Sequence, residues 1–252
     1  KVFHKSSNVR IHMTEVKEIL SSQNKIVTDT GIFDYDALVI ATGADTNFFG
    51  NAVMKENAMP MKSSAEAIPL RHRILSNFED ASAATDPLEL QRLMTVVVVG
   101  GGPTGVELSG AIADMRRFVL PKDYPELDLS TMRIILLEGS PKTLAMMSEK
   151  SSKESRQYLE KLGVDVQTDS LLSEYDGKTA LLKDGTKIET SLVIWAAGIK
   201  GNVPAGIDAS LIAKGNRIKT DGQCLVRDYT NIYAIGDVAF TDTDPAYPNG
   251  HP

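Results

Sequence analysis

The chain has 252 residues, 42% of them apolar and 24% charged, with a formal net charge of −6. These values are typical of a globular protein with one large domain or two small ones. No run of five or more Lys or Arg occurs, which argues against nucleic acid as the main partner. No apolar stretch approaches the ~18 residues that predict a membrane span. The single cysteine, Cys224, excludes an internal disulfide and a CxxC pair, and the four histidines show no helical metal-ligand spacing, so we expect no metal.

The first part of the chain alternates short strand patterns with turns. Residues 9–20, 24–30 and 35–42 predict strands of a β-meander, and we expect the last of them to be fully buried. A helix is predicted after Ser63, which forms a capping box with Glu66, and this helix would turn a common apolar face to the core through Ile68, Ile74, Leu75 and Phe78. A second helix is predicted from Asp86, with Pro87 in the favoured first position.

The middle of the chain predicts a mixed α/β fold. The strand "TVVVV" (95–99) leads into a glycine loop and a helix to about Phe118, and the next segment, 116–132, is predicted to be a loop. The strand "IILLE", a helix ended by Gly163, a further strand, a hairpin pair at 170–189 with turns at 176–177 and 184–185, and the buried strand "SLVIWAAG" follow. We therefore expect a Rossmann-like domain with an inserted β-hairpin at 51–212. The flanks, 1–50 and 213–252, are expected to be two parts of a second domain that ends in the polar loop 240–252.

The sequence "GGGPTG" (100–105) predicts a dinucleotide site because a strand precedes it and a helix follows. Gly100 permits the tight turn, Gly102 lets the backbone approach a pyrophosphate, and Gly105 lets helix and strand pack closely. The helix N-terminus offers free N–H groups and a partial positive charge to the phosphates. Pro103 and Thr104 begin this helix, and Pro103 loses nothing there, because an N-terminal N–H has no partner inside the helix.

Glu138 ends the strand that follows the glycine loop. A carboxylate in this place accepts hydrogen bonds from the ribose hydroxyls of NAD and repels the 2′-phosphate of NADP. Glu138 lies 38 residues after Gly100, where about 20 is usual, and the insert at 116–132 accounts for the excess. Lys142 is close enough in sequence to leave room for some use of NADPH. The alternative is that Glu138 is only a surface carboxylate at a strand end.

Four stretches together resemble a known family: "YDALVIATGADTNFFG", "VVVVGGGPTGVELSGAIADM", "SLVIWAAGIKGNV" and "NIYAIGDVA". Their order is similar to that in the flavoprotein reductases with two dinucleotide sites, in which an NAD domain is inserted into an FAD domain. "TNFFG", "LPKDYPEL" and "VIWAAG" resemble the type II NADH dehydrogenases, the non-proton-pumping NADH:quinone oxidoreductases. This resemblance implies hydride transfer from NADH to FAD and then electron transfer to a quinone.

The resemblance also implies roles for individual residues. Thr42 and Gly43 match the crossing from the FAD domain to the NAD domain, and Gly236 and Asp237 match a motif that holds FAD. Val16 matches a position whose backbone meets the adenine of FAD, Ala197 and Gly198 match a turn beside NAD, and Glu107 matches a catalytic glutamate near nicotinamide and flavin. The bland alternatives are a turn for Thr42 and Gly43, a helix N-cap for Asp237, and for Glu107 a carboxylate stabilised by the helix dipole.

The chain also departs from the family pattern. The family has a first glycine motif that grips FAD, whereas residues 1–50 contain only Gly31, Gly43 and Gly50. We therefore expect a piece of a longer polypeptide that binds NADH but retains little FAD. The quinone site and a peripheral membrane-binding part would lie outside this chain. The resemblance implies a location in the cytoplasm, with the parent protein on the cytoplasmic face of the inner membrane. A homodimer is among the expected partners, because exposed strand edges can pair with a second copy.

Two other functions compete with this one. A soluble FAD-dependent NAD(P)H reductase of a ferredoxin- or rubredoxin-like partner would carry the same nucleotide motifs. A non-catalytic nucleotide-binding or sensor module would not have the FAD-binding glycine motif in its natural sequence. Disulfide reductases and sulfide:quinone reductases of the same superfamily need cysteines that this chain does not have. Their exclusion favours electron flow from NADH through flavin to a quinone.

Overall fold

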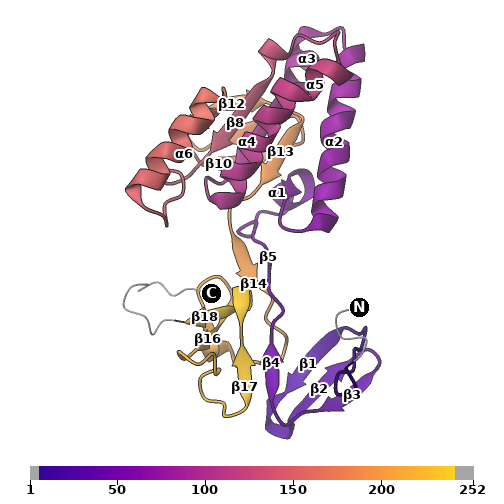
Figure 1. Cartoon of the computed structure of the whole chain (residues 1–252), viewed down its shortest axis with the longest axis vertical. Coiled ribbons are helices and arrows are strands. Elements are labelled where there is room, and N and C mark those ends of the chain that lie inside the picture. The colour runs from indigo at the N-terminus through magenta and orange to yellow at the C-terminus, as the bar shows by residue number, and fades with distance from the viewer. Residues whose placement is uncertain (1–5, 242–252) are drawn as a thin grey trace. The chain divides into compact units, whose positions relative to one another are not determined.

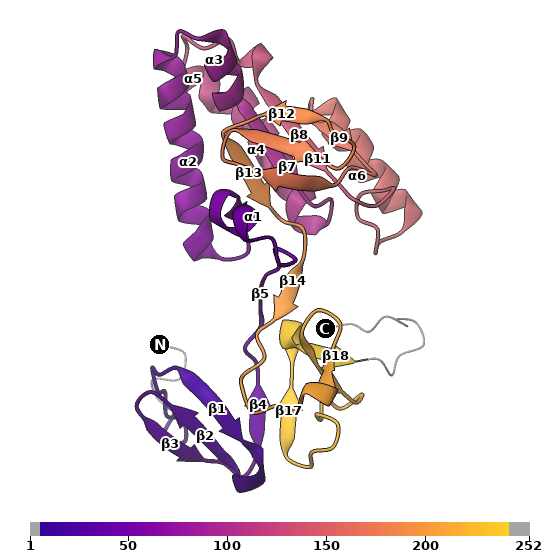
Figure 2. The ribbon, with the colours of Figure 1, turned by 180° about the vertical axis from the view of Figure 1, so that it is seen from behind.

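The computed structural model describes residues 6–241, which form two compact units. Unit 2 takes residues 46–198, and unit 1 takes the residues up to 45 and from 199 onward. Figure 1 shows the elements of each unit, and Figure 2 shows them from behind. The units therefore divide at 45/46 and 198/199, while the sequence places its domain limits at 50/51 and 212/213. The polar loop predicted at 240–252 lies outside the described residues from 242 onward.

Unit 2 is built on a parallel sheet of five strands in the order β6-β13-β7-β8-β9. The strands are β6 (Met59–Pro60), β7 (Thr95–Val99), β8 (Arg133–Leu137), β9 (Asp165–Gln167) and β13 (Leu192–Trp195). The central strands read as continuous apolar runs because the sheet is covered on both faces. The predicted Rossmann-like fold class is confirmed, since the parallel sheet and its crossover helices are those of a dinucleotide-binding fold.

The two faces of this sheet are covered by different layers. Val96 and Val98 pack with Ile134 and Leu136 against helices on one face. These helices are α2 (Ser64–Ala83), α3 (Pro87–Leu93), α4 (Pro103–Phe118) and α6 (Glu149–Lys161). Val97 and Val99 point to the other face, because side chains alternate along a strand. There they meet a small antiparallel sheet and α1 (Ala52–Asn57).

The antiparallel layer is the predicted insert, and it has three strands. These are β10 (Leu172–Tyr175), β11 (Thr179–Leu182) and β12 (Lys187–Glu189), paired in that order. Gly177 and Gly185 have φ of +93° and +89° at the two turns, which explains why Asp-Gly pairs stand there. The predicted pair of hairpins is therefore present, as three antiparallel strands joined by two turns.

The predicted helix signals of unit 2 are largely confirmed. The Ser63 hydroxyl accepts from the Glu66 N–H at 3.3 Å, and the Glu66 carboxylate accepts from the Ser63 N–H at 2.8 Å, which is the capping box of α2. Asp86 caps α3 ahead of Pro87, and Gly163 lies just after α6 with φ of +78°. The expected core position of Ile68 is wrong: its side chain is 60% exposed. The buried face of α2 runs through Leu70, Ile74, Phe78 and Ala81, and Ile68 lies on the opposite side.

The segment predicted as a plain loop at 116–132 is partly helical. It holds the end of α4, the short helix α5 (Leu120–Asp123) and the 3-10 turn η2 (Leu129–Thr131). Leu120 is fully buried, and the Tyr124 ring lies 5.6 Å from that of Phe78. Prolines suggested a loop, but Pro121 stands in the first turn of α5, where it is tolerated. Apolar anchoring therefore turns the insert into packed structure.

Unit 1 consists of small sheets around a separate core. An antiparallel sheet joins β1 (Val16–Leu20), β2 (Lys25–Thr28) and β3 (Gly31–Asp34). A parallel pair joins β4 (Leu38–Ile40) and β17 (Ile232–Ala234), and a third sheet joins β15 (Ile212–Ala213), β16 (Arg217–Thr220) and β18 (Ala239–Thr241). The remaining elements are η1 (Ser21–Gln23), β5 (Ala44–Thr46), β14 (Ile199–Gly201), η3 (Ala209–Leu211) and η4 (Gly236–Val238), with β5 paired to β14.

Two predictions in unit 1 are wrong. The first strand begins at Val16 rather than Val9, and Ile11 and Met13 are exposed. The last strand of the meander, β4, is not fully buried: only Ile40 is, and Val39 is 56% exposed. β4 pairs with β17 rather than with the meander. An apolar run of this length does not reveal how many faces its neighbours cover.

Candidate functional site

The glycine loop connects β7 to α4 and is shaped by close backbone contacts. Gly100 has φ of +109°, and a Cβ there would lie 2.7 Å from the Ala196 carbonyl carbon. A Cβ on Gly105 would collide with the Gly100 carbonyl oxygen. Both positions therefore require glycine for the loop to close. Gly102 differs, because a Cβ there meets nothing within 4 Å. The space beside Gly102 is free for a ligand.

The N-terminus of α4 points its first amide groups toward this space. Gly102 is the N-cap, Pro103 follows it, and the N–H groups of a first helical turn have no partner inside the helix. Thr104 is exposed and Gly105 is buried against β8. The loop therefore presents backbone donors and the positive end of the helix dipole, an arrangement that binds anions.

Glu138 lies beside the glycine loop despite its distance in sequence. One carboxylate oxygen accepts from the Gly101 N–H at 2.5 Å, and the other accepts from the Ser140 N–H at 2.7 Å. The strand pairing of β7 with β8 places the two strand ends side by side, so the insert between them does not alter this geometry. The two amides fix the carboxylate and leave it lone pairs for further hydrogen bonds.

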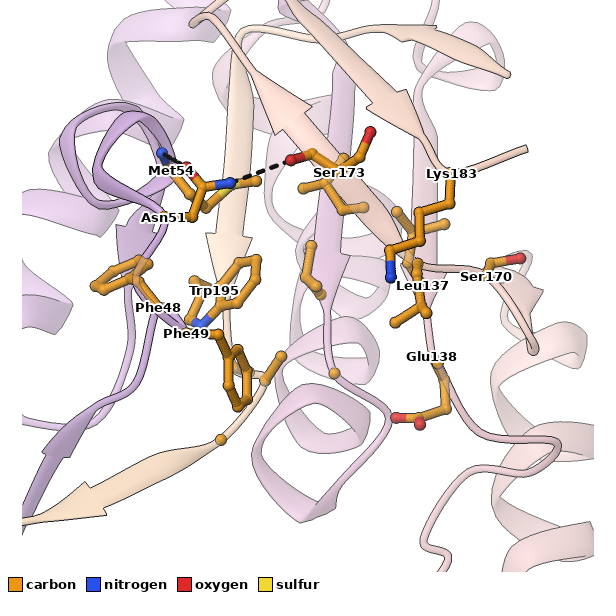
Figure 3. Close-up of a pocket in the computed structure, with 18 of the residues that line it drawn as sticks. Phe48, Phe49, Asn51, Met54, Leu137, Glu138, Ser170, Ser173, Lys183 and Trp195 are labelled. Atoms are coloured by element: carbon orange, nitrogen blue, oxygen red, sulfur yellow. Dashed lines mark hydrogen bonds between the residues drawn. The ribbon is translucent and has the colours of Figure 1, made fainter. Parts of the chain in front are cut away.

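A cavity of about 710 Å³ runs along the carboxyl ends of β8, β7 and β13 (Figure 3). It is lined by Glu138 at one end, by Gly100 and Gly102 in the middle, and by Ala197 and Gly198 at the other end. The structure thus brings these predicted residues into one pocket within unit 2. A ligand crevice outside the strand ends is the usual place for a site in an open α/β sheet.

Aromatic residues form the wall near Gly198. The Trp195 indole N–H donates to the Asn47 carbonyl at 2.9 Å, and the Phe48 ring stacks on Trp195 at 5.6 Å. Phe49 is 69% exposed and has φ of +50°, and the Asn47 side chain accepts from its N–H at 2.8 Å. These aromatic residues stand in "TNFFG" and "VIWAAG", which mark the family but do not by themselves place the rings in the pocket. Ser170 and Lys183 also line it, and no motif marks them.

Glu107 does not line this pocket. It lies on α4 in the first turns after the glycine loop, and its side chain is exposed. A catalytic role for Glu107 therefore stays a prediction that rests on the resemblance.

Unit 1 brings together four of the five residues matched to an FAD site. Thr42 and Gly43 follow β4, Gly236 and Asp237 follow β17, and these two strands are parallel neighbours. Gly43 and Gly236 have φ of +66° and +69°, and a Cβ on either would meet nothing within 4 Å. The Thr42 hydroxyl donates to the Asn202 carbonyl at 2.5 Å. Val16 lies apart, 42% exposed on the meander strand β1.

Residues 6–241 contain no group of three or more His, Cys, Asp or Glu that could hold a metal ion. None of the helices in this range is both long enough and apolar enough to cross a bilayer.

Comparison with known proteins agrees with this geometry. The profile of the family described as pyridine nucleotide-disulphide oxidoreductase matches residues 1–250. Type II NADH:quinone oxidoreductase NdhA of Mycobacterium tuberculosis is 33% identical over 262 residues, covering 99% of this chain and 56% of that protein. Type II NADH:quinone oxidoreductase of Haemophilus influenzae is 28% identical, covering 94% and 57%. The chain thus spans about half the length of the curated relatives it matches.

Solved structures share the fold. NDH2 from Plasmodium falciparum in complex with NADH matches with a TM-score of 0.80 at 24% identity, over 92% of this chain and 50% of that one. A ferredoxin reductase from Rhodopseudomonas palustris matches with a TM-score of 0.74 at 20% identity, over 99% and 55%. The resemblance indicated by the sequence is thereby confirmed at the level of the family. The chain belongs to the pyridine nucleotide-disulphide oxidoreductase family.

Proposed function

We propose that this chain is the NADH-binding core of an FAD-dependent type II NADH:quinone oxidoreductase. The observation that carries the proposal is the pocket of unit 2. It joins a fixed carboxylate, Glu138, to the open backbone face at Gly102 and the N-terminus of α4. The relatives named type II NADH:quinone oxidoreductase support the choice of dinucleotide and of electron acceptor.

The pocket fits an extended dinucleotide. In the proposed binding mode Glu138 accepts hydrogen bonds from the adenosine ribose, and the N–H groups of Gly102, Thr104 and Gly105 bind the pyrophosphate. Ala197 and Gly198 then flank the nicotinamide, with the Trp195 and Phe48 rings behind them. A volume of about 710 Å³ is within the usual range for a ligand site. Because the aromatic wall is largely apolar, it also excludes water from the reacting ring.

Unit 1 supplies candidate FAD-binding residues. Gly43 and Gly236 leave open space beside left-handed backbone, which is what a closely approaching cofactor needs. Thr42 and Asp237 lie next to these glycines, and Val16 is proposed for the adenine end. When bound, FAD would supply a two-electron acceptor for the hydride of NADH and a donor for the quinone.

The chain's own residues would then position the reactants. Glu107, in the first turns of α4, is proposed to act near the nicotinamide and flavin. Orientation is the main contribution asked of the protein, because hydride transfer itself needs no protein acid or base. We further propose that the whole enzyme works at the surface of a membrane in the cytoplasm, where it meets its quinone, and that it forms a homodimer.

The single tryptophan offers a direct test of dinucleotide binding. Trp195 lies in the pocket wall and is the only tryptophan of the chain, so bound NADH should quench it and emit by energy transfer. We expect saturable transfer in the wild type. We expect binding weaker by roughly tenfold in Glu138→Ala, since a charge-assisted hydrogen-bond acceptor is lost.

Glu174→Ala is the matched control. Glu174 is an exposed carboxylate on β10 that does not line the pocket, so its removal should leave NADH binding unchanged. No transfer in the wild type would refute the proposed site. Equal behaviour of the Glu138 and Glu174 variants would remove Glu138 from its role.

A further inference from the structure

The pocket contains a cationic side chain, Lys183, in addition to the carboxylate of Glu138. Among its lining residues only Glu138 and Lys183 carry a charge. Figure 3 shows the Lys183 side chain turned into the pocket, toward Leu137 and the end where Glu138 lies. Any ligand at that end therefore meets a negative and a positive group together.

Backbone hydrogen bonds hold Lys183 in this place. Its N–H donates to the Leu171 carbonyl at 2.9 Å, and the Ser170 N–H donates to the Glu138 carbonyl at 2.9 Å. The loop of Ser170 and Leu171 thus links Lys183, which follows β11, to Glu138, which follows β8. The tight turn at Gly185, where the Leu182 N–H donates to the Thr186 carbonyl at 2.8 Å, fixes the other side of Lys183. The position of the lysine is a product of the inserted sheet.

The Lys183 ammonium is available to a ligand. It forms no ion pair or side-chain hydrogen bond with any residue of the described range 6–241. Lys142, which the sequence suggested as a cation for NADPH, differs on both counts. It pairs with Glu149 at the start of α6, and it does not line the pocket.

We propose that Lys183 is a second determinant of dinucleotide choice: it binds the 2′-phosphate of NADPH. This inference rests on the proposed function, in which Glu138 binds the adenosine ribose. The 2′-phosphate of NADPH replaces the ribose 2′-hydroxyl that faces Glu138 in NADH, so it is repelled by Glu138 and attracted by Lys183. The pocket therefore accepts NADH best and NADPH at a reduced affinity, because Glu138 is held by two amides and Lys183 is exposed to screening water.

Calorimetric titration of the whole chain with NADH and NADPH tests the inference. Lys183→Gln should weaken NADPH by roughly five- to tenfold and leave NADH within about twofold, because one charge-assisted contact to phosphate is lost. The pair 2′,5′-ADP and 5′-AMP should repeat this difference, since these ligands differ only in the 2′-phosphate. In the wild type, raised salt should weaken 2′,5′-ADP more than 5′-AMP, because the contact of Lys183 with the 2′-phosphate is screened.

Two control lysines separate a local contact from general charge. Lys187→Gln changes an exposed lysine on the same small sheet outside the pocket, and Lys142→Gln changes the paired one. Both variants should leave the ratio of the NADPH affinity to the NADH affinity unchanged. Glu138→Gln should raise that ratio, and Lys183→Gln in the same chain should lower it again.

The possible failures are distinct. If NADH binds the wild type and Lys183→Gln leaves NADPH unaltered, the proposal on Lys183 is overturned and the NADH site stands. Equal weakening of both dinucleotides would also overturn it, since Lys183 would then contact a group that both share. If the wild type binds neither dinucleotide, the proposed function fails and the inference falls with it.

Discussion

Units 1 and 2 both place left-handed glycines within three residues of the ends of parallel strands, yet the chain continues differently after them. In unit 2, Gly100 follows β7 and leads into the long helix α4. In unit 1, Gly43 follows β4 and Gly236 follows β17, and the helical turns among its described residues are three-residue 3-10 turns. A glycine turn gives a ligand room, but a helix N-terminus also gives it aligned donors and a dipole. We therefore expect unit 2 to bind phosphate without unit 1, whereas the described residues of unit 1 give a ligand room but no long helix N-terminus.

The largest effect is expected at Gly105. Gly105→Val should prevent the glycine loop from closing onto α4, because any Cβ there collides with the Gly100 carbonyl oxygen. We expect a loss of about 3 kcal/mol or more in the free energy of unfolding of unit 2. Urea unfolding followed by Trp195 fluorescence measures it. A midpoint equal to that of the wild type would show that the close approach is not required.

Gly102→Asp should separate binding from folding. The position is open, so we expect unfolding close to wild type, but the new carboxylate would repel the pyrophosphate and weaken NADH on the order of 100-fold. Gly236→Asp adds the same charge to unit 1, with some backbone strain because φ there is +69°, and should leave NADH binding intact. Energy transfer from Trp195 gives both affinities. Similar losses in the two variants would mean that unit 2 does not bind the dinucleotide alone.

Flavin retention sharpens the same comparison. Because unit 1 lacks a long helix beside Gly43 or Gly236 in its described residues, we expect the chain to retain little FAD while it binds NADH. Flavin absorbance after incubation with FAD and gel filtration measures retention. A chain that stays loaded with flavin and reduces a quinone analogue would contradict this expectation.

Buried Tyr175 predicts a smaller, pH-dependent difference. Desolvation raises the pKa of the Tyr175 phenol from about 10 to about 12. The unfolded chain therefore releases this proton first as the pH rises. The stabilisation is complete below about pH 10 and is lost between about pH 10 and 12, by about 2 kcal/mol. Urea unfolding at about pH 9 and pH 11 should show a loss that Tyr175→Phe reduces. The control Tyr158→Phe, at a 63% exposed position, should keep the full loss.

The smallest effect is expected in unit 1. Thr42→Val removes the hydroxyl that donates to the Asn202 carbonyl at 2.5 Å and should cost about 1 kcal/mol, because the acceptor stays near solvent. Hydrogen exchange at Ile40 and Ile232 reports on this unit, and Trp195 fluorescence should not change. A shift in the Trp195 midpoint would show that the two units unfold together.

Local chemistry explains which parts of the fold were predictable. Ser63 with Glu66, Asp86 with Pro87 and the glycine loop each act through neighbours a few residues away, so sequence reveals them. Pairing partners are different, because β4 joins β17 from the far end of the chain and no pattern in either strand names the other. The same holds in the pocket. Gly102 and Glu138 carry a motif, whereas Ser170 and Lys183 are brought in by the fold of the small sheet.

The segment between α4 and β8 has a practical consequence for engineering. α5 and η2 are packed there, yet the carboxylate of Glu138 reaches the Gly101 N–H because β7 and β8 are hydrogen-bonded neighbours. The cost of closing a loop rises only slowly with its length. We therefore expect that a tag or a reporter domain inserted at the exposed residues 125–126, between the packed Tyr124 and Leu127, leaves the geometry of the dinucleotide pocket unchanged.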